Sequence, residues 1–207
     1  MGQRRAVAVQ RGVPGPSNDD LHPDPDERRL AIAMEAGDAR AALSLLMDLH
    51  GTYIYRYCRQ MVGTDADGED VSQTVFMQAF EAIQRRSRVG KVRPWLRGIA
   101  RHRCLDRLEG RRKSPMPVPI EELDRAVDAD AAQDGPIPDP RLGKALDDCL
   151  DELDPRSRTV VLLRFHDQLS YDDISRLTGD RSGALRVRVN RALPALRDCM
   201  KRKGGIP

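Results

Sequence analysis

Arginines recur through residues 181–191 of this chain, on the faces of an expected helix that its apolar residues leave free. The candidate binding residues of this stretch, four arginines and three small or polar residues between them, are Arg181, Ser182, Ala184, Arg186, Arg188, Asn190 and Arg191. A planar guanidinium donates two parallel hydrogen bonds, so arginine suits both phosphate oxygens and the edge of a guanine base. The stretch therefore indicates contact with a nucleic acid, and a solvated basic helix surface is the alternative that it leaves open.

Two helices are expected before this basic stretch. Asp154 suits an N-cap and Pro155 the first helical position, where the missing N–H is not needed. The apolar positions of this helix are Val160, Val161, Leu163 and Phe165. Ser170 and Asp173 have the Ser-x-x-acid spacing of a second helix start.

The basic stretch itself is expected to form a third helix. Thr178, Gly179 and Asp180 interrupt the periodicity, and Ser182 can cap the helix that follows. Its apolar positions are Leu185, Val189, Ala192 and Leu196. Two short helices joined by a glycine-containing turn predict a helix-turn-helix that lays its second helix in the major groove. Pro194 should kink or end that helix.

A second basic segment lies between residues 85 and 113. Pro94 is expected to open a helix that runs to about residue 109, with Leu96, Ala100, Cys104 and Leu108 as its buried ladder. The other faces of this helix carry Arg93, Arg97, Arg101, Arg103, Arg107 and Arg111. Like charges at this spacing repel by a few tenths of a kcal/mol per pair, which favours a compensating anion. We therefore expect nucleic-acid contact, with a purely solvated helix as the alternative.

A third feature is the helix expected over residues 69–83, after a polar turn at residues 64–68. Its inward positions are Val71, Val75, Phe76, Ala79, Phe80 and Ile83. Its other side carries Asp70, Gln73, Thr74 and Met77, a polar surface with one large apolar side chain. Such a surface fits either a docking face for another protein or ordinary solvated surface, and periodicity does not choose between them.

Composition limits the class of protein. The chain has 207 residues, a net charge of +3 and 32% charged residues, which fits a soluble protein of one or two domains. No apolar run approaches the roughly 20 residues that span a bilayer, so we expect a cytoplasmic protein. Aromatic residues make up only 4%, and runs of alternating β-branched residues are absent. The expected fold is all-α, as two small helical domains joined by a flexible acidic linker.

The chain order suggests an N-terminal arm at residues 1–25, a first domain at 26–113, a linker at 114–140 and a second domain at 141–207. The arm mixes Gly, Pro, Arg and Asp without periodicity, and the linker is rich in Pro, Asp and Glu. We expect the arm to be disordered and the linker to be a solvated spacer or to lie in a basic groove of a partner.

The remaining residues give little support to catalysis or metal binding. Four scattered cysteines, Cys58, Cys104, Cys149 and Cys199, have no metal-ligand spacing and are expected to be reduced and mostly buried. No nucleophile stands with a base at a recognisable spacing, which argues against a DNA-acting enzyme such as a recombinase. We expect no enzymatic activity, no metal and no cofactor.

Two motif blocks together resemble the extracytoplasmic-function group of bacterial sigma factors, the promoter-recognition subunits of RNA polymerase. GEDVSQTVFMQAFEAI at residues 68–83, followed by VRPWLRGIARHRCLDRLEGRRK at 92–113, looks like the second conserved region of that family. Residues 153–197, from LDPRSRTVV to RALPALR, look like the fourth. The resemblance runs from about Glu27 to Lys203. It implies a non-enzymatic initiation factor, and a stand-alone helix-turn-helix regulator is the alternative.

The resemblance also implies roles for particular residues. Docking on core RNA polymerase falls to Asp70, Gln73, Thr74 and Met77. Capture of the −10 promoter element falls to Arg88, Lys91, Arg93, Trp95, Arg97, Arg101, His102, Arg103 and Arg107. Reading of the −35 element in the major groove falls to the residues of 181–191 named above. The implied partners are core polymerase, promoter DNA and an anti-sigma factor, with no insertion into a membrane.

Overall fold

The computed structural model describes residues 25–87, 89, 91–110, 139–204 and 206. Within these ranges the chain is built from helices and turns and contains no strand, which confirms the expected all-α fold. The expected N-terminal arm and acidic linker fall almost entirely outside the described residues, and so does Arg88.

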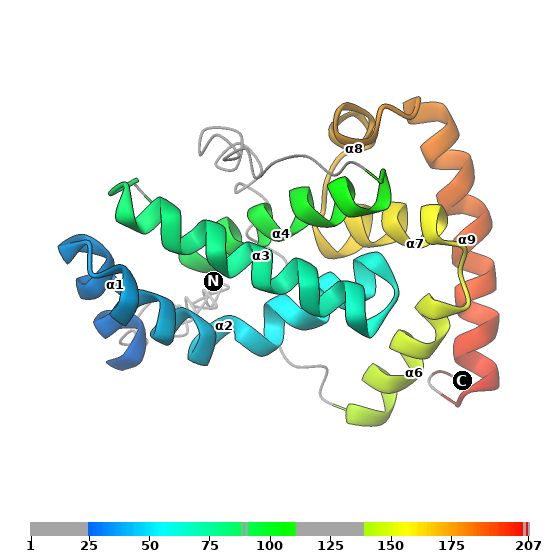
Figure 1. The fold of residues 1–207 in the computed structure, drawn as a ribbon. Helices are drawn as coiled ribbons and strands as arrows, with labels where there is room; N and C mark the ends of the chain where they lie inside the picture. The colour runs from blue at the N-terminus through cyan, green and yellow to red at the C-terminus, as the bar shows by residue number, and fades with distance from the viewer. Residues whose placement is uncertain (1–24, 88, 90, 111–138, 205, 207) are drawn as a thin grey trace, which may run out of the picture.

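The first group of helices packs into a bundle (Figure 1). It consists of α1 (Pro25–Ala36), α2 (Ala39–Val62), α3 (Asp65–Gln84) and α4 (Val92–Leu108). The chain turns between α1 and α2, where Gly37 adopts a φ of 71° and the Asp38 side chain accepts a hydrogen bond from the Ala41 amide. We call this group the N-terminal bundle.

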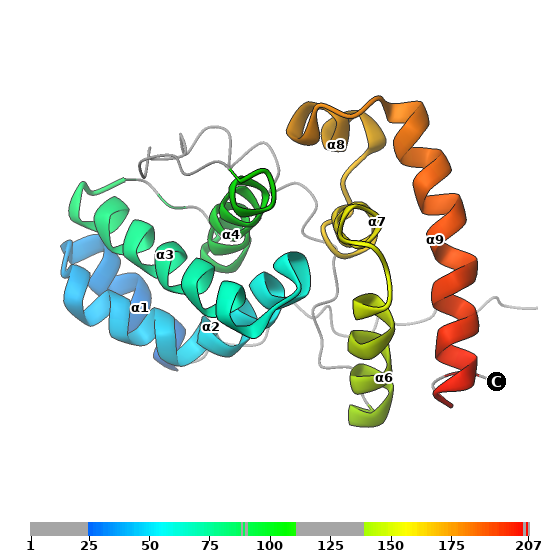
Figure 2. The same ribbon diagram turned by 45° about the vertical axis from the view of Figure 1, so that its right-hand side comes forward.

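The second group, here the C-terminal bundle, follows in the chain and lies beside the first (Figure 2). It consists of α6 (Pro140–Asp151), α7 (Pro155–Val161), the π-helix η3 (Leu162–His166), α8 (Tyr171–Thr178) and α9 (Ser182–Arg202). Helices α8 and α9 pack on each other and form the two helices of the expected helix-turn-helix.

Several expected helix starts are confirmed in atomic detail. The Asp154 carboxylate caps α7 by accepting a 3.0 Å hydrogen bond from the Ser157 amide. Ser170 and Asp173 form a reciprocal capping box at the start of α8, which satisfies two amides without an intrahelical partner. Gly179 ends α8 in the left-handed conformation, at a φ of 75° that favours glycine.

Other local expectations were wrong. The turn before α3 is shorter than expected, because α3 already begins at Asp65 and the Thr64 side chain accepts from the Asp67 amide. Ser182 does not cap α9; it is the first helical residue, and its hydroxyl donates to the Asp172 carboxylate at 2.7 Å. Phe165, expected to be inward, is 52% exposed.

Pro194 does not end α9, which continues to Arg202. The neighbouring apolar residues explain this, because Ala192 before the proline and Cys199 and Met200 after it are all buried. Their burial stabilises the helix on both sides of the lost backbone hydrogen bond.

The hydrophobic core is continuous between the two bundles. One cluster of buried residues includes Ile54 of α2, Leu96 of α4, Leu163 of η3 and Leu185 of α9. Each of these four residues is fully buried. The surfaces predicted to contact DNA and polymerase are therefore held on one packed helical body.

Candidate nucleic-acid interface

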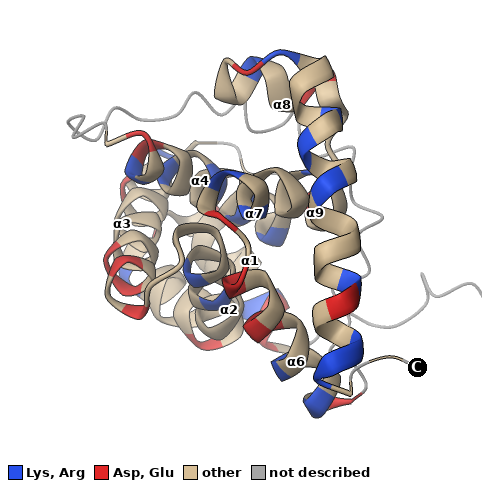
Figure 3. Ribbon diagram, turned by 90° about the vertical axis from the view of Figure 1, so that its right-hand side faces the viewer, with Lys and Arg blue, Asp and Glu red and all other residues tan. Residues whose placement is uncertain are grey.

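The basic surface of α9 lies on the outside of the molecule. Figure 3 shows lysines and arginines repeated along this helix. Of the residues predicted to read the −35 element, five are exposed, namely Arg181, Ala184, Arg186, Asn190 and Arg191; Ser182 and Arg188 are half-buried. This arrangement leaves most of the predicted reading surface open to a ligand.

Two of these arginines have partners within the helix-turn-helix. The Arg188 guanidinium donates to the Asp180 carboxylate at 2.8 Å. Asp180, which follows the turn residue Gly179, therefore forms an ion pair with α9. The Arg186 guanidinium lies 5.3 Å from the centre of the Tyr171 ring, in a cation-π contact across α8 and α9. Arg186 remains exposed in this contact.

The second predicted DNA-binding set, on and before α4, is much less accessible. Lys91 and Arg107 are exposed, Arg93 and His102 are half-buried, and Trp95, Arg97, Arg101 and Arg103 are buried. Arg107 pairs with Asp67 of α3, and the Arg93 guanidinium lies 4.2 Å from the centre of the Tyr53 ring. Among the described residues of this set, only Lys91 and Arg107, at the two ends of α4, are fully exposed.

The buried arginines are neutralised by carboxylates of the chain itself. Arg97 and Arg101, which are 5% and 3% exposed, both face Asp167 of the C-terminal bundle. Arg103 donates to the Gln78 side-chain oxygen at 2.9 Å and pairs with Asp106 at 3.0 Å. Carboxylates of Asp167 and Asp106 thus supply compensating anions for these arginines within the chain, and their contact with nucleic acid stays a prediction.

Asp167 is the centre of this contact between the bundles. Its carboxylate accepts a 2.8 Å hydrogen bond from the Tyr57 hydroxyl and lies 3.2 Å from His166 Nδ1. Burial opposes ionisation, but the hydrogen bond from His166 and the charge of Arg101 outweigh it and hold the pKa of Asp167 below its usual value. Burial also raises the pKa of the Tyr57 phenol, so this hydroxyl stays a donor.

The face of α3 predicted to dock on polymerase is open. Asp70, Gln73 and Met77 are exposed, and Thr74 is half-buried with its hydroxyl donating to the Asp70 carbonyl at 2.9 Å. Met77 is 66% exposed, which leaves a flexible apolar side chain in the middle of a polar surface. The inward side of α3 is buried as expected, apart from the half-buried Phe80.

Comparison with known proteins matches this architecture. The family model for sigma-70 region 2 matches residues 46–114, and that for sigma-70 region 4 matches residues 143–196. The chain is 30% identical over 183 residues to the ECF RNA polymerase sigma factor SigE of Mycolicibacterium smegmatis, covering 87% of this chain and 71% of that protein. It is 32% identical over 181 residues to the ECF RNA polymerase sigma factor SigD of Mycobacterium tuberculosis, covering 83% of this chain and 84% of that protein.

The chain belongs to the extracytoplasmic-function sigma factors. It is thus a promoter-recognition subunit of RNA polymerase, and the alternative of a stand-alone helix-turn-helix regulator is not favoured. The sigma-70 region 2 match covers α3 and α4, and the region 4 match covers most of the C-terminal bundle.

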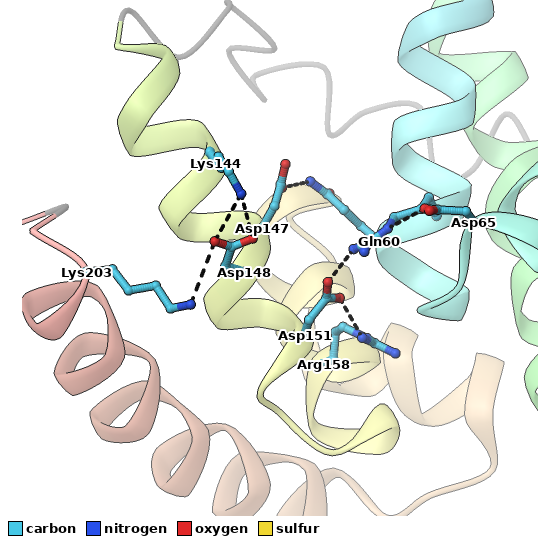
Figure 4. Close-up of polar contacts among 9 residues, drawn as sticks. Gln60, Asp65, Lys144, Asp147, Asp148, Asp151, Arg158 and Lys203 are labelled. Carbon is cyan, nitrogen blue, oxygen red and sulfur yellow. Dashed lines mark hydrogen bonds and ion pairs between the residues drawn. The ribbon is translucent and has the colours of Figure 1, made fainter.

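The two bundles of this sigma factor also meet through α6 (Figure 4). Gln60 of α2 donates to Asp147 at 2.6 Å. Asp151 pairs with Arg59 of α2 at 2.6 Å and with Arg158 of α7 at 3.0 Å. Asp148, in contrast, pairs within the C-terminal bundle, with Lys144 and Lys203. Acids along α6 therefore connect α2 on one side with α9 on the other.

The cysteines of this sigma factor differ from expectation. Cys149 of α6 and Cys199 of α9 form a disulfide, whereas Cys58 and Cys104 are free and buried. Burial and the neighbouring Cys58 raise the pKa of the Cys104 thiol well above its usual value, which makes it unreactive. The expectation of four reduced thiols was wrong for Cys149 and Cys199, because helix packing brings together two cysteines that are 50 residues apart.

Sequence reasoning missed the cluster around Asp167. A single acid that follows a helix has no spacing that points to a partner more than a hundred residues earlier. The only local signal is the pair His166-Asp167 next to exposed Phe165, at the end of an apolar run. The π-helical turn and the positive φ of 54° at Gln168, which set the course of the chain here, have no sequence signature of their own.

No group of three or more His, Cys, Asp or Glu side chains is arranged to hold a metal ion within the described ranges. Among the helices that the structure describes, none has the length and apolar character needed to cross a membrane.

Proposed function

We propose that this sigma factor divides promoter recognition between its two bundles. Helix α9 reads the −35 element in the major groove, and α4 with the loop before it captures the −10 element. The outer face of α3 docks on core polymerase. The chain has no catalytic role in this scheme, and it acts in the cytoplasm under the control of an anti-sigma factor, as the family resemblance implies.

The observation that carries the proposal is the exposed reading surface of α9. Arg186, Asn190 and Arg191 are exposed on a helix that follows a glycine turn, and their side chains suit base edges and phosphates. The opposite side of α9 is fixed by buried Leu185, Val189 and Ala192. A rigid helix with donors on one side supports sequence reading by direct contact.

The roles of α3 and α4 are supported by charge and exposure. Exposed Met77, surrounded by polar residues, suits a surface that another protein covers. The α4 track carries exposed Lys91 and Arg107 at its ends and the guanidinium groups of Arg97 and Arg101 between them. A regulator that works without polymerase has no use for either surface.

The test is reconstitution with core polymerase, followed by run-off transcription from a pool of genomic fragments. Promoter-dependent transcripts are expected only when both proteins are present. Arg186→Ala should weaken binding to the selected promoters by about 1 to 3 kcal/mol, if this arginine contacts a guanine edge. Arg197→Ala is the matched control, because Arg197 is exposed on the same helix but lies beyond the reading stretch. Sequence-specific footprints by the free chain alone would contradict the proposal.

A further inference from the structure

An exposed valine lies in the middle of the reading surface of α9. Val187 is 50% exposed, whereas Leu185 and Val189, two positions before and after it, are buried. Two positions along an α-helix correspond to a rotation of about 200°. Val187 therefore lies on the side of α9 that faces away from the core, which is the side proposed to enter the major groove.

The residues around Val187 on this side of the helix are small or polar. Gly183 lies one turn before it, and a Cβ at Gly183 would meet no atom within 4 Å. Ala184 is exposed on the same turn as Gly183, and Asn190 and Arg191 are exposed one turn after Val187. The small residues before Val187 leave room for a ligand to approach this valine closely.

Helix stability does not explain a valine at this position. Valine has a lower helix propensity than alanine, because its branched Cβ restricts the rotamers that it can adopt in a helix. Single exposed apolar residues are common in proteins, but Val187 lies among side chains predicted to contact DNA. Arg186 and Arg188 are its neighbours in sequence, and Asn190 lies one turn away. This position favours a ligand contact over an accident of the surface.

We propose that Val187 binds the C5-methyl group of a thymine in the −35 element. The inference rests on the proposed function, because it names the base that one position of the α9 reading surface recognises. Thymine presents its C5-methyl group in the major groove, and apolar side chains pack on this group. The contact removes apolar surface of both the valine and the thymine from water, which stabilises the complex.

The polar neighbours of Val187 suit the other groups of the same groove. The Asn190 amide can donate to and accept from base edges, and the longer Arg191 side chain suits phosphate oxygens. Val187 and Asn190 are about 4.5 Å apart along the helix axis, and successive base pairs are about 3.4 Å apart. The thymine should therefore lie within one or two base pairs of the pair that Asn190 contacts.

A protein side chain is the alternative ligand for Val187. The valine also lines a cavity of about 700 Å³ between α9 and the turn at residues 152–157. The α9 wall of this cavity carries Arg188 and Arg191 beside Val187. These cations favour a polyanion over an apolar peptide, so DNA suits the surroundings of Val187 better. Removal of a single methyl group from the DNA distinguishes the two ligands.

The test makes this change in the promoter. Core polymerase is reconstituted with the full chain on a promoter selected by run-off transcription. Each thymine of the −35 element is then replaced in turn by deoxyuridine, which keeps the base pair and lacks only the methyl group. Binding of the reconstituted polymerase is measured by competition with a labelled promoter. One replacement should lower the affinity about fourfold, which corresponds to about 0.8 kcal/mol for one buried carbon.

Val187→Ala should remove the dependence on the methyl group. Its affinity for the thymine promoter should fall about fourfold, and the thymine and uracil promoters should then bind equally well. Comparison of both proteins on both promoters isolates the contact between the two groups. Leu193→Ala is the matched control and should keep the fourfold difference, because Leu193 is 37% exposed on another side of α9. Circular dichroism should show that Val187→Ala is folded, since alanine favours a helix.

Three results would overturn the inference. The first is equal binding of the wild-type chain to the thymine promoter and to every uracil promoter, a measurement that needs no variant. The second is a uracil effect of the same size in Val187→Ala and in the wild type. The third is weaker binding by Val187→Ala with no uracil effect in the wild type, which would assign Val187 to a protein contact in the cavity. Promoter-dependent transcription by the wild-type chain would still support the proposed function in all three cases, whereas its absence would overturn both.

Discussion

The Tyr57 hydroxyl donates a 2.8 Å hydrogen bond to the Asp167 carboxylate, which lies 110 residues further along the chain. This contact joins α2 of the N-terminal bundle to the end of η3 in the C-terminal bundle. Since the acceptor is charged and both groups are buried, the bond belongs to the stronger class of hydrogen bonds. It is one of the contacts that make the two sigma regions a single packed body.

Tyr57→Phe should therefore lower the free energy of unfolding by about 1.5 to 3 kcal/mol, since it deletes one hydrogen bond to a charged group. Urea unfolding followed by circular dichroism measures the loss. Tyr55→Phe is the matched control, because Tyr55 lies on the same helix, is exposed and makes no hydrogen bond with the described residues. Equal losses in the two variants would show that the Asp167 contact does not stabilise the protein.

Gly63 gives a second test of the contact between the bundles. It ends α2 at a φ of 94°, and a Cβ at this position would lie 2.0 Å from the Arg158 guanidinium. Gly63→Ala should destabilise the protein by at least about 1 kcal/mol through backbone strain alone, and more through the clash. The clash should also push the Arg158 guanidinium away from Asp151 and weaken that ion pair, and urea unfolding measures the total loss.

Gly51→Ala is the internal control for this effect. Gly51 lies inside α2, and a Cβ there meets no atom within 4 Å. The substitution should stabilise the protein by about 0.5 to 1 kcal/mol, because alanine favours a helix interior. Opposite signs for the two alanine variants are the expected result, and a loss of similar size at both positions would contradict it.

The parts of this structure that depend on local chemistry were predictable from the sequence. Capping by Asp154, the box of Ser170 with Asp173 and the turn at Gly179 each need only residues within a few positions of one another. The apolar periodicity likewise indicated which sides of α3 and α9 are buried. These features follow from helix geometry and have little competition from distant parts of the chain.

The parts that depend on distant packing were not predictable. Periodicity described the arginines of α4 as separate ladders, but it could not show that Asp167 would cover Arg97 and Arg101. The pairing of Cys149 with Cys199 was missed for the same reason. The first contact depends on how the two bundles pack, and the second on how α6 packs against α9 within the C-terminal bundle, and spacing along the chain carries no such information.

Acid should destabilise the C-terminal bundle through its helix caps. Hydrogen bonds from Ser157 hold the pKa of Asp154 below its usual value, and hydrogen bonds from Ser170 do the same for Asp173. A carboxyl whose pKa is lower in the folded state stabilises the fold above its unfolded pKa, and this contribution is lost as the pH falls through the folded value. Stability should therefore decrease as the pH falls below about 4.

Asp154→Asn separates the charge from the cap. Asparagine caps a helix about as well as aspartate but does not titrate in this range. The Asp154→Asn variant should therefore lose less unfolding free energy between pH 7 and pH 3 than the wild type does. Asp154→Ala removes the cap as well and should cost about 1 kcal/mol at pH 7. Urea unfolding at the two pH values distinguishes the variants, and an identical pH dependence in wild type and Asp154→Asn would contradict the prediction.

The disulfide between α6 and α9 predicts both a thiol count and a change in stability. Under denaturing conditions without reductant, two free thiols should react, from Cys58 and Cys104. The bond closes a loop across 50 residues of sequence, so reduction should lower the free energy of unfolding by about 2 to 4 kcal/mol. A variant with Cys149→Ala and Cys199→Ala should be insensitive to reductant. Four reactive thiols in protein kept under air would show that the bond does not form.

The exposed methionine of α3 predicts where polymerase binds. Met77→Asp places a charge in the centre of the proposed docking face and should weaken binding to core polymerase by at least tenfold, because a buried unpaired carboxylate costs several kcal/mol at an interface. Its fold should be unchanged, since the side chain is 66% exposed. Ile32→Asp is the matched control, because Ile32 is 67% exposed on α1, outside the proposed docking face. Pull-down of core polymerase with each variant gives the comparison. Equal binding by the two variants would show that the docking surface does not lie on α3.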